Sequence, residues 1–178
     1  MELLVTGGAG FIGSHLVDAL INEGHEVTVI DNLSTGRADN VNQRARFYHM
    51  DICSTEMESV FHGSHIDAVF HLAAQTSVSD SWADPMRDAK TNILGTMSIL
   101  TCSIRHGVRR AIFASSAAVY GNPGRVTIAE DAALDPISPY AVSKCAGEQY
   151  LGVISSQYGL GGCVVRFSNV YGPRQIPD

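Results

Sequence analysis

TGGAGFIG, residues 6–13, decides how this chain folds. The apolar run Leu3-Leu4-Val5 precedes it, and an amphipathic helix pattern with Leu16 and Leu20 on its apolar face follows. The order is therefore a buried strand, a tight glycine turn and a helix. The glycines fit two related spacings, G-x-G-x-x-G at Gly8, Gly10 and Gly13, and G-x-x-G-x-x-G at Gly7, Gly10 and Gly13. This context predicts a turn that brings a dinucleotide pyrophosphate to the positive end of the helix.

Asp31 supports the same interpretation. It ends the next apolar run, Glu26 to Asp31, about 20 residues beyond the glycine turn, where a carboxylate accepts hydrogen bonds from the adenosine ribose. Its negative charge favours NAD over NADP, although Arg37 is near enough to soften that preference. The alternative is that Asp31 only begins a turn, Asp-Asn-Leu-Ser.

Length and composition indicate one soluble globular domain. The chain has 178 residues, enough for one sizeable core and too few for two full domains. A net charge of −6 disfavours nucleic acid or an anionic membrane as the main partner. We see no membrane-spanning run and no signal region, so we expect a cytoplasmic protein.

The cysteines and histidines do not indicate a metal site. Cys53, Cys102, Cys145 and Cys163 are far apart in the chain and form no C-x-x-C pair, so we expect reduced cysteines that mostly fill the core. His62 and His65 could share a helical face, but a solvated helix end is the better interpretation.

Apolar runs alternate with helical patterns along the whole chain. This alternation predicts an α/β fold with a parallel sheet wound on both sides. We expect strands near residues 2–6, 26–31, 45–49, 67–72, 110–115 and 162–167, and helices near 11–23, 54–62, 85–106 and 138–158.

Several residues suggest where these helices begin and end. Thr55 and Glu58 form a capping box for the second helix, and Gly107 ends the third. Ser138 caps the fourth, with Pro139 in its first turn. Residues 121–137 form a long loop at the carboxyl edge of the sheet, where such folds bind ligands.

A second group of residues predicts chemistry at that edge. Tyr140 and Lys144 lie four apart and share a helix face, while Ser115 and Ser116 end a strand. A tyrosinate can take the proton of a substrate hydroxyl as its carbon loses hydride. A nearby ammonium and a positive nicotinamide would lower the pKa of that tyrosine from about 10. Alone, a Y-x-x-x-K pair on a helix usually lies on the surface without a catalytic role. The glycine turn and the serines together with it indicate a catalytic site.

These motifs together resemble the extended short-chain dehydrogenase/reductases, and among them the NAD-dependent nucleotide-sugar epimerases typified by UDP-glucose 4-epimerase. The resemblance runs nearly end to end. It is carried by TGGAGFIG at 6–13, DNLSTG at 31–36, Asp51-Ile52, HLAAQ at 71–75, TNILGT at 91–96, ASSAAVYG at 114–121, SPYAVSK at 138–144 and RFSNVYGPRQ at 166–175.

The resemblance implies roles for individual positions. Catalytic residues would be Ser116, Tyr140 and Lys144. NAD would be held by Gly7, Gly10, Phe11, Ile12, Asp31, Asn32, Leu33, Ser34, Thr35, Gly36, Asp51, Ile52, Leu72, Ala73, Ala74, Gln75, Asn92, Tyr140, Lys144, Phe167 and Val170. The nucleotide sugar would contact Ser77, Ser116, Tyr140 and Asn169. The alternatives are that Ala73, Ala74 and Val170 are only core, and that Asn92 only braces the sheet.

The resemblance also implies a reaction. Ala117 and Ala118 follow Ser116 where the related dehydratases carry an acidic pair, which disfavours elimination of water. Oxidation at C4, rotation of the ketose and return of the hydride then interconvert UDP-hexoses such as UDP-glucose and UDP-galactose. Two other functions stay open: an NAD(P)-dependent sugar-nucleotide reductase or dehydrogenase, and a non-catalytic NAD-binding fragment.

The family also suggests what lies beyond this sequence and how copies pair. Its members continue for well over a hundred residues past Gly-Pro-Arg-Gln. We therefore expect residues 1–178 to form the NAD-binding domain, with the smaller substrate domain largely absent. Members form homodimers through a four-helix bundle. Here Ile93, Met97, Leu100 and Ile104 supply an apolar stripe that could pair, or could pack on the sheet.

Overall fold

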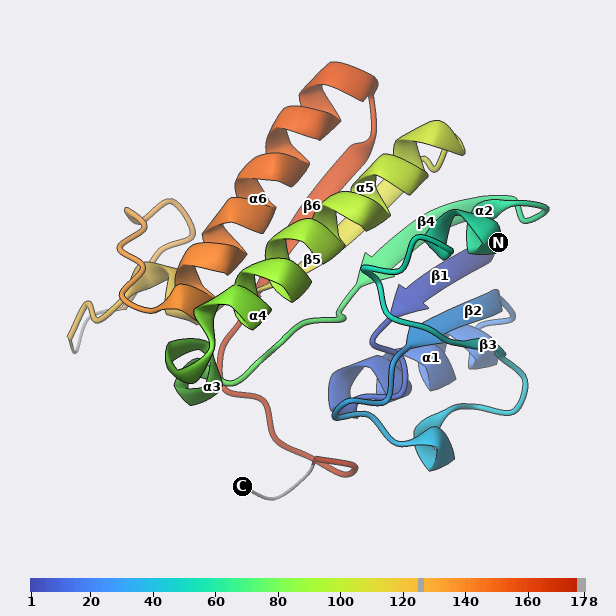
Figure 1. The fold of residues 1–178 in the computed structure, drawn as a ribbon, viewed down its shortest axis with the longest axis horizontal. Coiled ribbons are helices and arrows are strands. Elements are labelled where there is room, and N and C mark those ends of the chain that lie inside the picture. Colours follow the sequence, from blue (N-terminus) through green and yellow to red (C-terminus); the bar gives the residue numbers. More distant parts are fainter. Residues whose placement is uncertain (125–126, 176–178) are drawn as a thin grey trace.

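The computed structural model describes residues 1–124 and 127–175, and these form a six-stranded parallel sheet covered by helices (Figure 1). The strands stand in the order β3-β2-β1-β4-β5-β6. Their bounds are Glu2–Thr6 (β1), Glu26–Asp31 (β2), Arg46–His49 (β3), Ile66–His71 (β4), Arg110–Ser116 (β5) and Gly161–Phe167 (β6). The strand order reverses between β1 and β4, where folds of this type leave a crevice at the carboxyl edge.

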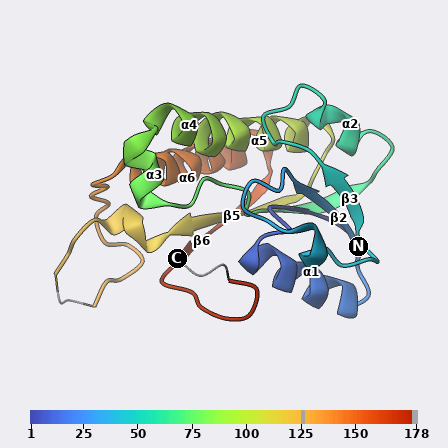
Figure 2. The same ribbon diagram turned by 60° about the horizontal axis from the view of Figure 1, so that its bottom comes forward.

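Helices lie on both faces of the sheet (Figure 2). Helix α1 (Phe11–Asn22) covers β1 and β2 on one face. The opposite face carries α2 (Met57–Phe61), α5 (Thr96–Arg105) and α6 (Pro139–Tyr158). Shorter elements connect them: α3 (Val78–Ala83), α4 (Pro85–Ala89), the π-helical η2 (Lys90–Gly95), and the 3₁₀ turns η1 (Ala38–Asn40) and η3 (Ala117–Tyr120).

Each face of the sheet has its own apolar cluster. The larger one, which includes Leu4, Phe61, Ile99 and Leu151, packs β1, β4 and β5 against α2, α5 and α6. The smaller one joins β1 and β2 to α1. Continuous apolar strands thus bury both of their sides, as expected for a parallel sheet.

The predicted fold class is confirmed, and the six strands fall within a residue or two of their expected positions. Ser138 caps α6 by accepting a hydrogen bond from the amide of Ala141 at 3.1 Å, as predicted. Gly107, with φ of 68°, follows the end of α5. The loop expected at 121–137 is present where it is described; residues 125 and 126 lie outside the described residues.

One local prediction was wrong. Thr55 and Glu58 do not form a capping box: α2 begins at Met57, its N-cap is Glu56, and no side chain caps it. The expected helix at 85–106 is present as a continuous run of helical residues, 85–105, in which the π-helical η2 lies between α4 and α5. The short α3 was not expected; Ser77 begins it, accepting a hydrogen bond from the amide of Asp80.

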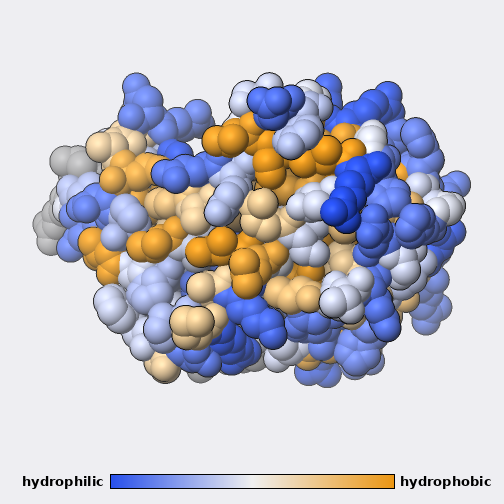
Figure 3. Space-filling model, turned by 45° about the horizontal axis from the view of Figure 1, so that its top comes forward, coloured by the Kyte–Doolittle hydropathy of each residue, from blue (hydrophilic) through white to orange (hydrophobic). Residues whose placement is uncertain are grey.

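An exposed apolar face runs along α6 and η2. Figure 3 shows hydrophobic side chains gathered across the side of the molecule that these helices form. Leu94 on η2 and Val142, Tyr150 and Val153 on α6 are each more than 40 % exposed. Among the described residues, no helix combines the length and the apolar character needed to cross a bilayer.

The glycine turn makes a prediction about stability. A Cβ on Gly13 would lie 2.1 Å from the carbonyl oxygen of Gly7, and the next nearest atoms, Gly7 C and Gly8 Cα, are also backbone, which cannot turn aside as a flexible side chain can. We expect Gly13→Ala to lower the free energy of unfolding by at least about 2 kcal/mol, measured by urea denaturation.

Gly152 on α6 is the matched control, since a Cβ there meets nothing within 4 Å. Gly152→Ala should raise the free energy of unfolding by about 0.5–1 kcal/mol, because alanine loses less backbone entropy in a helix. Equal effects of the two substitutions would contradict the close approach at Gly13.

Candidate functional site

A cavity of about 880 Å³ lies at the carboxyl edge of the sheet. The ends of β1, β2, β4, β5 and β6, the first turn of α1 and the start of α6 surround it. Its lining residues are Gly7, Gly10, Phe11, Ile12, Gly13, Asp31, Asn32, Ser34, Thr35, Asn40, Met50, Asp51, Ile52, Leu72, Ala73, Ala74, Thr76, Thr91, Ala114, Ser115, Ser116, Tyr140, Lys144, Phe167, Ser168, Asn169, Val170, Arg174 and Gln175.

The first turn of α1 faces this cavity without a side-chain cap. Its N-cap is Gly10, which has no side chain to accept hydrogen bonds from the turn. The N–H groups of the first helical turn have no partner within a helix, and they carry the positive end of the helix dipole. Gly7, with φ of 73°, closes the turn by accepting a hydrogen bond from the amide of Gly10 at 3.1 Å. These residues fit a pyrophosphate.

Asp31 is buried at the end of β2 and is bound to the glycine turn. Its Oδ2 accepts a hydrogen bond from the amide of Ala9 at 3.0 Å, and its Oδ1 accepts one from the amide of Leu33 at 2.8 Å. Each carboxylate oxygen keeps a further lone pair, so the group can still accept hydrogen bonds from a ribose. Arg37 instead points to Asp39, 3.5 Å from its carboxylate.

Most of the predicted cofactor residues line this one cavity, and five predicted residues do not. Leu33, Gly36, Gln75, Asn92 and Ser77 lie outside the lining. Leu33 and Gly36 belong to the turn around Asp31, where a Cβ on Gly36 would come within 3.0 Å of Asp31 Oδ1. The hydroxyl of Ser77 caps α3, as described above.

Asn92 is buried in η2 and braces the loop that leaves β4. Its Oδ1 accepts a hydrogen bond from the amide of Gln75 at 2.8 Å, and its Nδ2 lies 3.0 Å from the carbonyl oxygen of Gln75. The same Nδ2 lies 3.0 Å from Asp88 and 3.1 Å from Ser143. Through these bonds Asn92 holds the loop that carries Leu72 to Ala74 along the cavity.

The two serines at the end of β5 have different environments. Ser115 donates a hydrogen bond to Glu148 on α6 at 2.5 Å, and Glu148 forms a bidentate ion pair with Arg166 on β6. Ser116 is the N-cap of η3 and lies beside the phenol of Tyr140. The structure therefore assigns Ser115 to the packing of α6 and leaves Ser116 beside Tyr140.

Lys144 is buried one helical turn after Tyr140. Its ammonium donates a hydrogen bond to the carbonyl of Ala114 at 2.8 Å and lies 5.8 Å from the centre of the Tyr140 ring. The predicted convergence of Ser116, Tyr140 and Lys144 on one cavity is present in the structure.

The protonation of these groups differs from the sequence expectation. Burial lowers the pKa of Lys144 to about 8, although Asp88 opposes that shift. Burial also raises the pKa of Tyr140 above 10; its interaction with Ser116 opposes the rise and Asp88 adds to it. The expected lowering of the tyrosine pKa by the nearby ammonium is therefore not achieved by the residues of this chain alone.

Sequence reasoning missed two buried polar groups behind the site. Asp88 on α4 is 1 % exposed and acts electrostatically on both Tyr140 and Lys144. His71 ends β4 between the hydroxyls of Thr6 and Thr96, and burial lowers its pKa to about 3. Asp88 belongs to none of the motifs named above. His71 begins the HLAAQ motif, but the motif does not reveal its buried place, which the packing of α4 and β4 decides.

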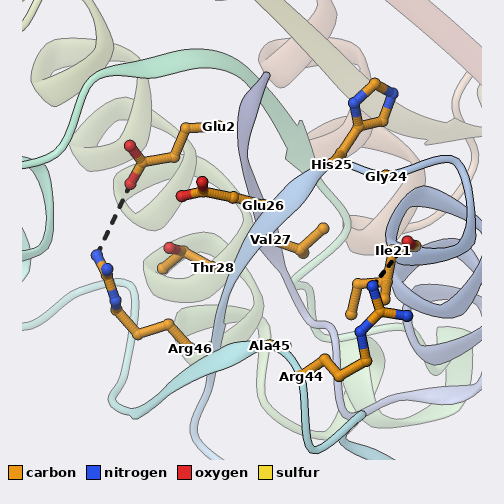
Figure 4. A pocket seen from close by; sticks show the side chains of 10 residues that line it. All are labelled: Glu2, Ile21, Gly24, His25, Glu26, Val27, Thr28, Arg44, Ala45 and Arg46. Atoms are coloured by element: carbon orange, nitrogen blue, oxygen red, sulfur yellow. Dashed lines mark hydrogen bonds and ion pairs between the residues drawn. The ribbon is translucent and has the colours of Figure 1, made fainter.

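A second hollow, of about 490 Å³, lies at the amino edge of the sheet (Figure 4). Both of its arginines already have partners in the chain. Arg46 pairs with Glu2 at 3.7 Å, and Arg44 donates to the carbonyl of Ile21 at 3.4 Å. The unoccupied donors of the α1 turn make the carboxyl-edge cavity the better candidate.

Comparisons with known proteins agree with this geometry. The model of the NAD dependent epimerase/dehydratase family matches residues 3–178. The UDP-glucose 4-epimerase of Mycolicibacterium smegmatis is 42 % identical over 183 residues, covering 99 % of this chain and 58 % of that protein. The chain thus spans somewhat more than half the length of such relatives.

Two solved structures show the same fold. UDP-glucose 4-epimerase of Thermotoga maritima with UDP-glucose is 49 % identical, with a TM-score of 0.96, and covers 99 % of this chain and 58 % of that one. The Thermus thermophilus UDP-glucose 4-epimerase in complex with NAD is 44 % identical, with a TM-score of 0.97, and covers 100 % of this chain and 58 % of that one.

The buried ammonium predicts a pH dependence of stability. Since the pKa of Lys144 falls from 10.5 when unfolded to about 8 when folded, only the unfolded chain holds this proton between those values. Stability therefore rises with pH across that window, by up to about 3 kcal/mol. We expect the unfolding free energy of the wild type minus that of Lys144→Met to increase from pH 8 to pH 10, measured by urea denaturation. A difference that stays constant would show that Lys144 is not desolvated.

Proposed function

Because the chain belongs to the NAD dependent epimerase/dehydratase family, we propose that it binds NAD in the carboxyl-edge cavity and epimerises a UDP-hexose at C4. The observation that carries this proposal is the meeting of the uncapped α1 turn, Asp31 and the Ser116–Tyr140–Lys144 set around one cavity. In this proposal residues 1–178 are the NAD-binding domain.

The cavity supports NAD in preference to NADP. The pyrophosphate would lie at Gly10 to Gly13, and the ribose hydroxyls would bind Asp31. A 2′-phosphate would be repelled by that carboxylate, and Arg37 is paired with Asp39. Around the adenine would lie Asp51 and Ile52, and near the nicotinamide Phe167 and Val170.

The catalytic set supports oxidation and reduction of a carbon that carries oxygen. When bound, NAD supplies the acceptor and later the donor of the hydride. Tyr140 would hold the proton of the sugar hydroxyl, Ser116 would hydrogen-bond the same oxygen, and Lys144 would bind the ribose. Asn169 at the rim of the cavity would contact the nucleotide sugar. The contact of Ser77 with the nucleotide sugar stays a prediction; in this structure the Ser77 hydroxyl caps α3.

Epimerisation is favoured over elimination of water by the residues after Ser116. Ala117 and Ala118 form the first half of η3 at this position, and an alanine side chain cannot transfer a proton. The UDP-glucose 4-epimerases that match the chain agree with this choice.

A second candidate function is that of an NAD-binding unit without turnover. The uncapped α1 turn and Asp31, which would bind NAD, lie on the cavity independently of the catalytic set. Isothermal calorimetry with NAD, followed by incubation with UDP-galactose and chromatography for UDP-glucose, separates the two. NAD binding with conversion supports the epimerase, and NAD binding without conversion supports the second function.

Tyr140→Phe tests the catalytic assignment. Loss of the phenol proton should reduce conversion of UDP-galactose by at least about a hundredfold, because general acid–base groups contribute that much or more. Affinity for NAD, measured by calorimetry, should remain within about threefold, since the ring and its packing are kept.

Tyr158→Phe is the matched control. Tyr158 ends the same helix, is 63 % exposed and lies outside the cavity. This substitution should leave conversion unchanged. If Tyr140→Phe retained full conversion, Tyr140 would lose its assigned role.

We also propose that the chain forms a homodimer through α6 and the neighbouring η2–α5 helix. The expected stripe does not supply this surface: Leu100 is buried, and Met97 and Ile104 pack against the same core. The exposed residues Leu94, Val142, Tyr150 and Val153 support the dimer instead. On α6 the last three follow one face, at intervals of eight and three residues.

Val153→Glu tests this surface. Val153 is 67 % exposed, so a charge there should not disturb the monomer but should oppose burial against a second copy. We expect light scattering to show a dimer for the wild type and at least a tenfold weaker dimer for the variant. The control Asn22→Glu adds the same charge to α1 on the opposite face and should leave the mass unchanged. A monomeric wild type would reject the dimer.

Finally, we propose a cytoplasmic location. The four cysteines are all free, which is typical of a reducing compartment. The net charge of −6 supports a small-molecule substrate and not nucleic acid or a membrane surface.

A further inference from the structure

Three potential metal ligands meet between α2 and the end of α5. Glu58 lies on α2, His62 follows it directly, and His106 caps the C-terminus of α5. One ligand atom from each lies within 4.8 Å of the other two. The cluster was not visible in the sequence, where His62 had only His65 as a nearby partner, because His106 is 44 residues further along the chain.

The local backbone holds two of these side chains in place. The amide of His62 donates to the carbonyl of Glu58 at 3.2 Å, and this helical turn puts both side chains on one face. The amide of His106 donates to the carbonyl of Cys102 at 3.0 Å. Its ring packs on Phe61, with ring centres 5.6 Å apart. The position of His106 is therefore set by the core.

The imidazole of His106 has an unsatisfied nitrogen that faces the cluster. Its Nε2 is buried and has no hydrogen-bond partner, although Glu58 Oε1 lies 3.5 Å away. The ring of His62 stands edge-on to it, with ring centres 4.9 Å apart. A buried polar atom without a partner costs free energy, and a metal ion held by these three groups would satisfy it.

The charges around the cluster also suit one divalent ion. Glu58 uses Oε2 for Arg105, at 3.4 Å, and keeps Oε1 for the cluster. The positive charge of Arg105, which pairs with Glu58, opposes a metal ion at this place. The Arg105 side chain is 61 % exposed, so it can turn outward into solvent.

From this geometry we propose that Glu58, His62 and His106 form a structural zinc site. Two imidazoles and a carboxylate are ligands that zinc prefers, and a water would complete the tetrahedron. Zinc–nitrogen bonds of about 2.0–2.1 Å put tetrahedral ligand atoms about 3.3 Å apart. The exposed side chain of His62 can close the remaining distance by rotation.

The site would act on stability and not on the chemistry at the cavity. It lies near the starts of β4 and β5, at the amino edge of the sheet, whereas the cavity lies at the carboxyl edge. The ion would link α2 to α5, two helices that already pack together. An ion that binds only the folded chain adds RT ln(1 + [Zn²⁺]/Kd) to its free energy of unfolding and so raises its melting temperature.

Calorimetry and thermal unfolding with zinc chloride test the proposal, using untagged protein treated with a chelator. We expect one equivalent of zinc to bind and to raise the melting temperature. His62→Asn should weaken zinc binding at least tenfold. His65→Asn is the control, because His65 is 87 % exposed and outside the cluster, and it should stay within twofold of wild type.

Cobalt provides an independent measurement. Binding of Co²⁺ at Glu58, His62 and His106 should give visible absorption of a nitrogen–oxygen site without a thiolate band, since no cysteine is a ligand. Equal weakening by His62→Asn and His65→Asn, a thiolate band, or the absence of one-equivalent binding would overturn the proposal. NAD affinity should not change with zinc, so this result is independent of the proposed epimerase activity.

Discussion

The rest of the structure depends on the close contact between two glycines in the first turn. Gly13 packs so closely on Gly7 that a Cβ would overlap the carbonyl oxygen, and a Cβ on Gly7 would lie 2.7 Å from the amide of Ala73. This contact lets α1 begin directly beyond β1, next to the loop that leaves β4. The free N–H groups of α1 therefore open into the crevice where the strand order reverses.

The glycine turn also fixes the part of the site that would hold a ribose. Ala9 donates its amide to Asp31, and its carbonyl accepts hydrogen bonds from the amide of Arg37 at 3.1 Å and from Asn40 Nδ2 at 3.0 Å. One residue of the turn thus anchors the end of β2 and the loop after it. These hydrogen bonds set the spacing between the proposed pyrophosphate and ribose positions, so the region would be preorganised for binding.

Sequence motifs predicted the features that depend on residues near in the chain. They did not predict the features that depend on packing between distant segments. The glycine turn, Asp31 and the Ser138 cap depend on neighbours in the chain, so their patterns were sufficient. The wide turn at η2 was not predictable, because Asn92 is held there by Gln75 and Ser143, which are distant in sequence. The same reason hid Asp88 and His106. The apolar stripe through Leu100 was ambiguous, since periodicity does not say which partner covers a face.

The charges behind the site explain how one phenol could serve as both acid and base. Lys144 is fully buried against the ring of Phe113, 5.0 Å away, and the carboxyl of Asp88 favours its charged form. The same carboxyl raises the pKa of Tyr140, so the chain alone keeps the phenol protonated and ready to donate. A positive charge entering the cavity would lower that pKa and favour the phenolate, whereas a neutral group would leave it raised. The protonation of Tyr140 would then depend on the charge of the group in the cavity. A reversible oxidation needs this link between the proton of the phenol and the charge of the cofactor.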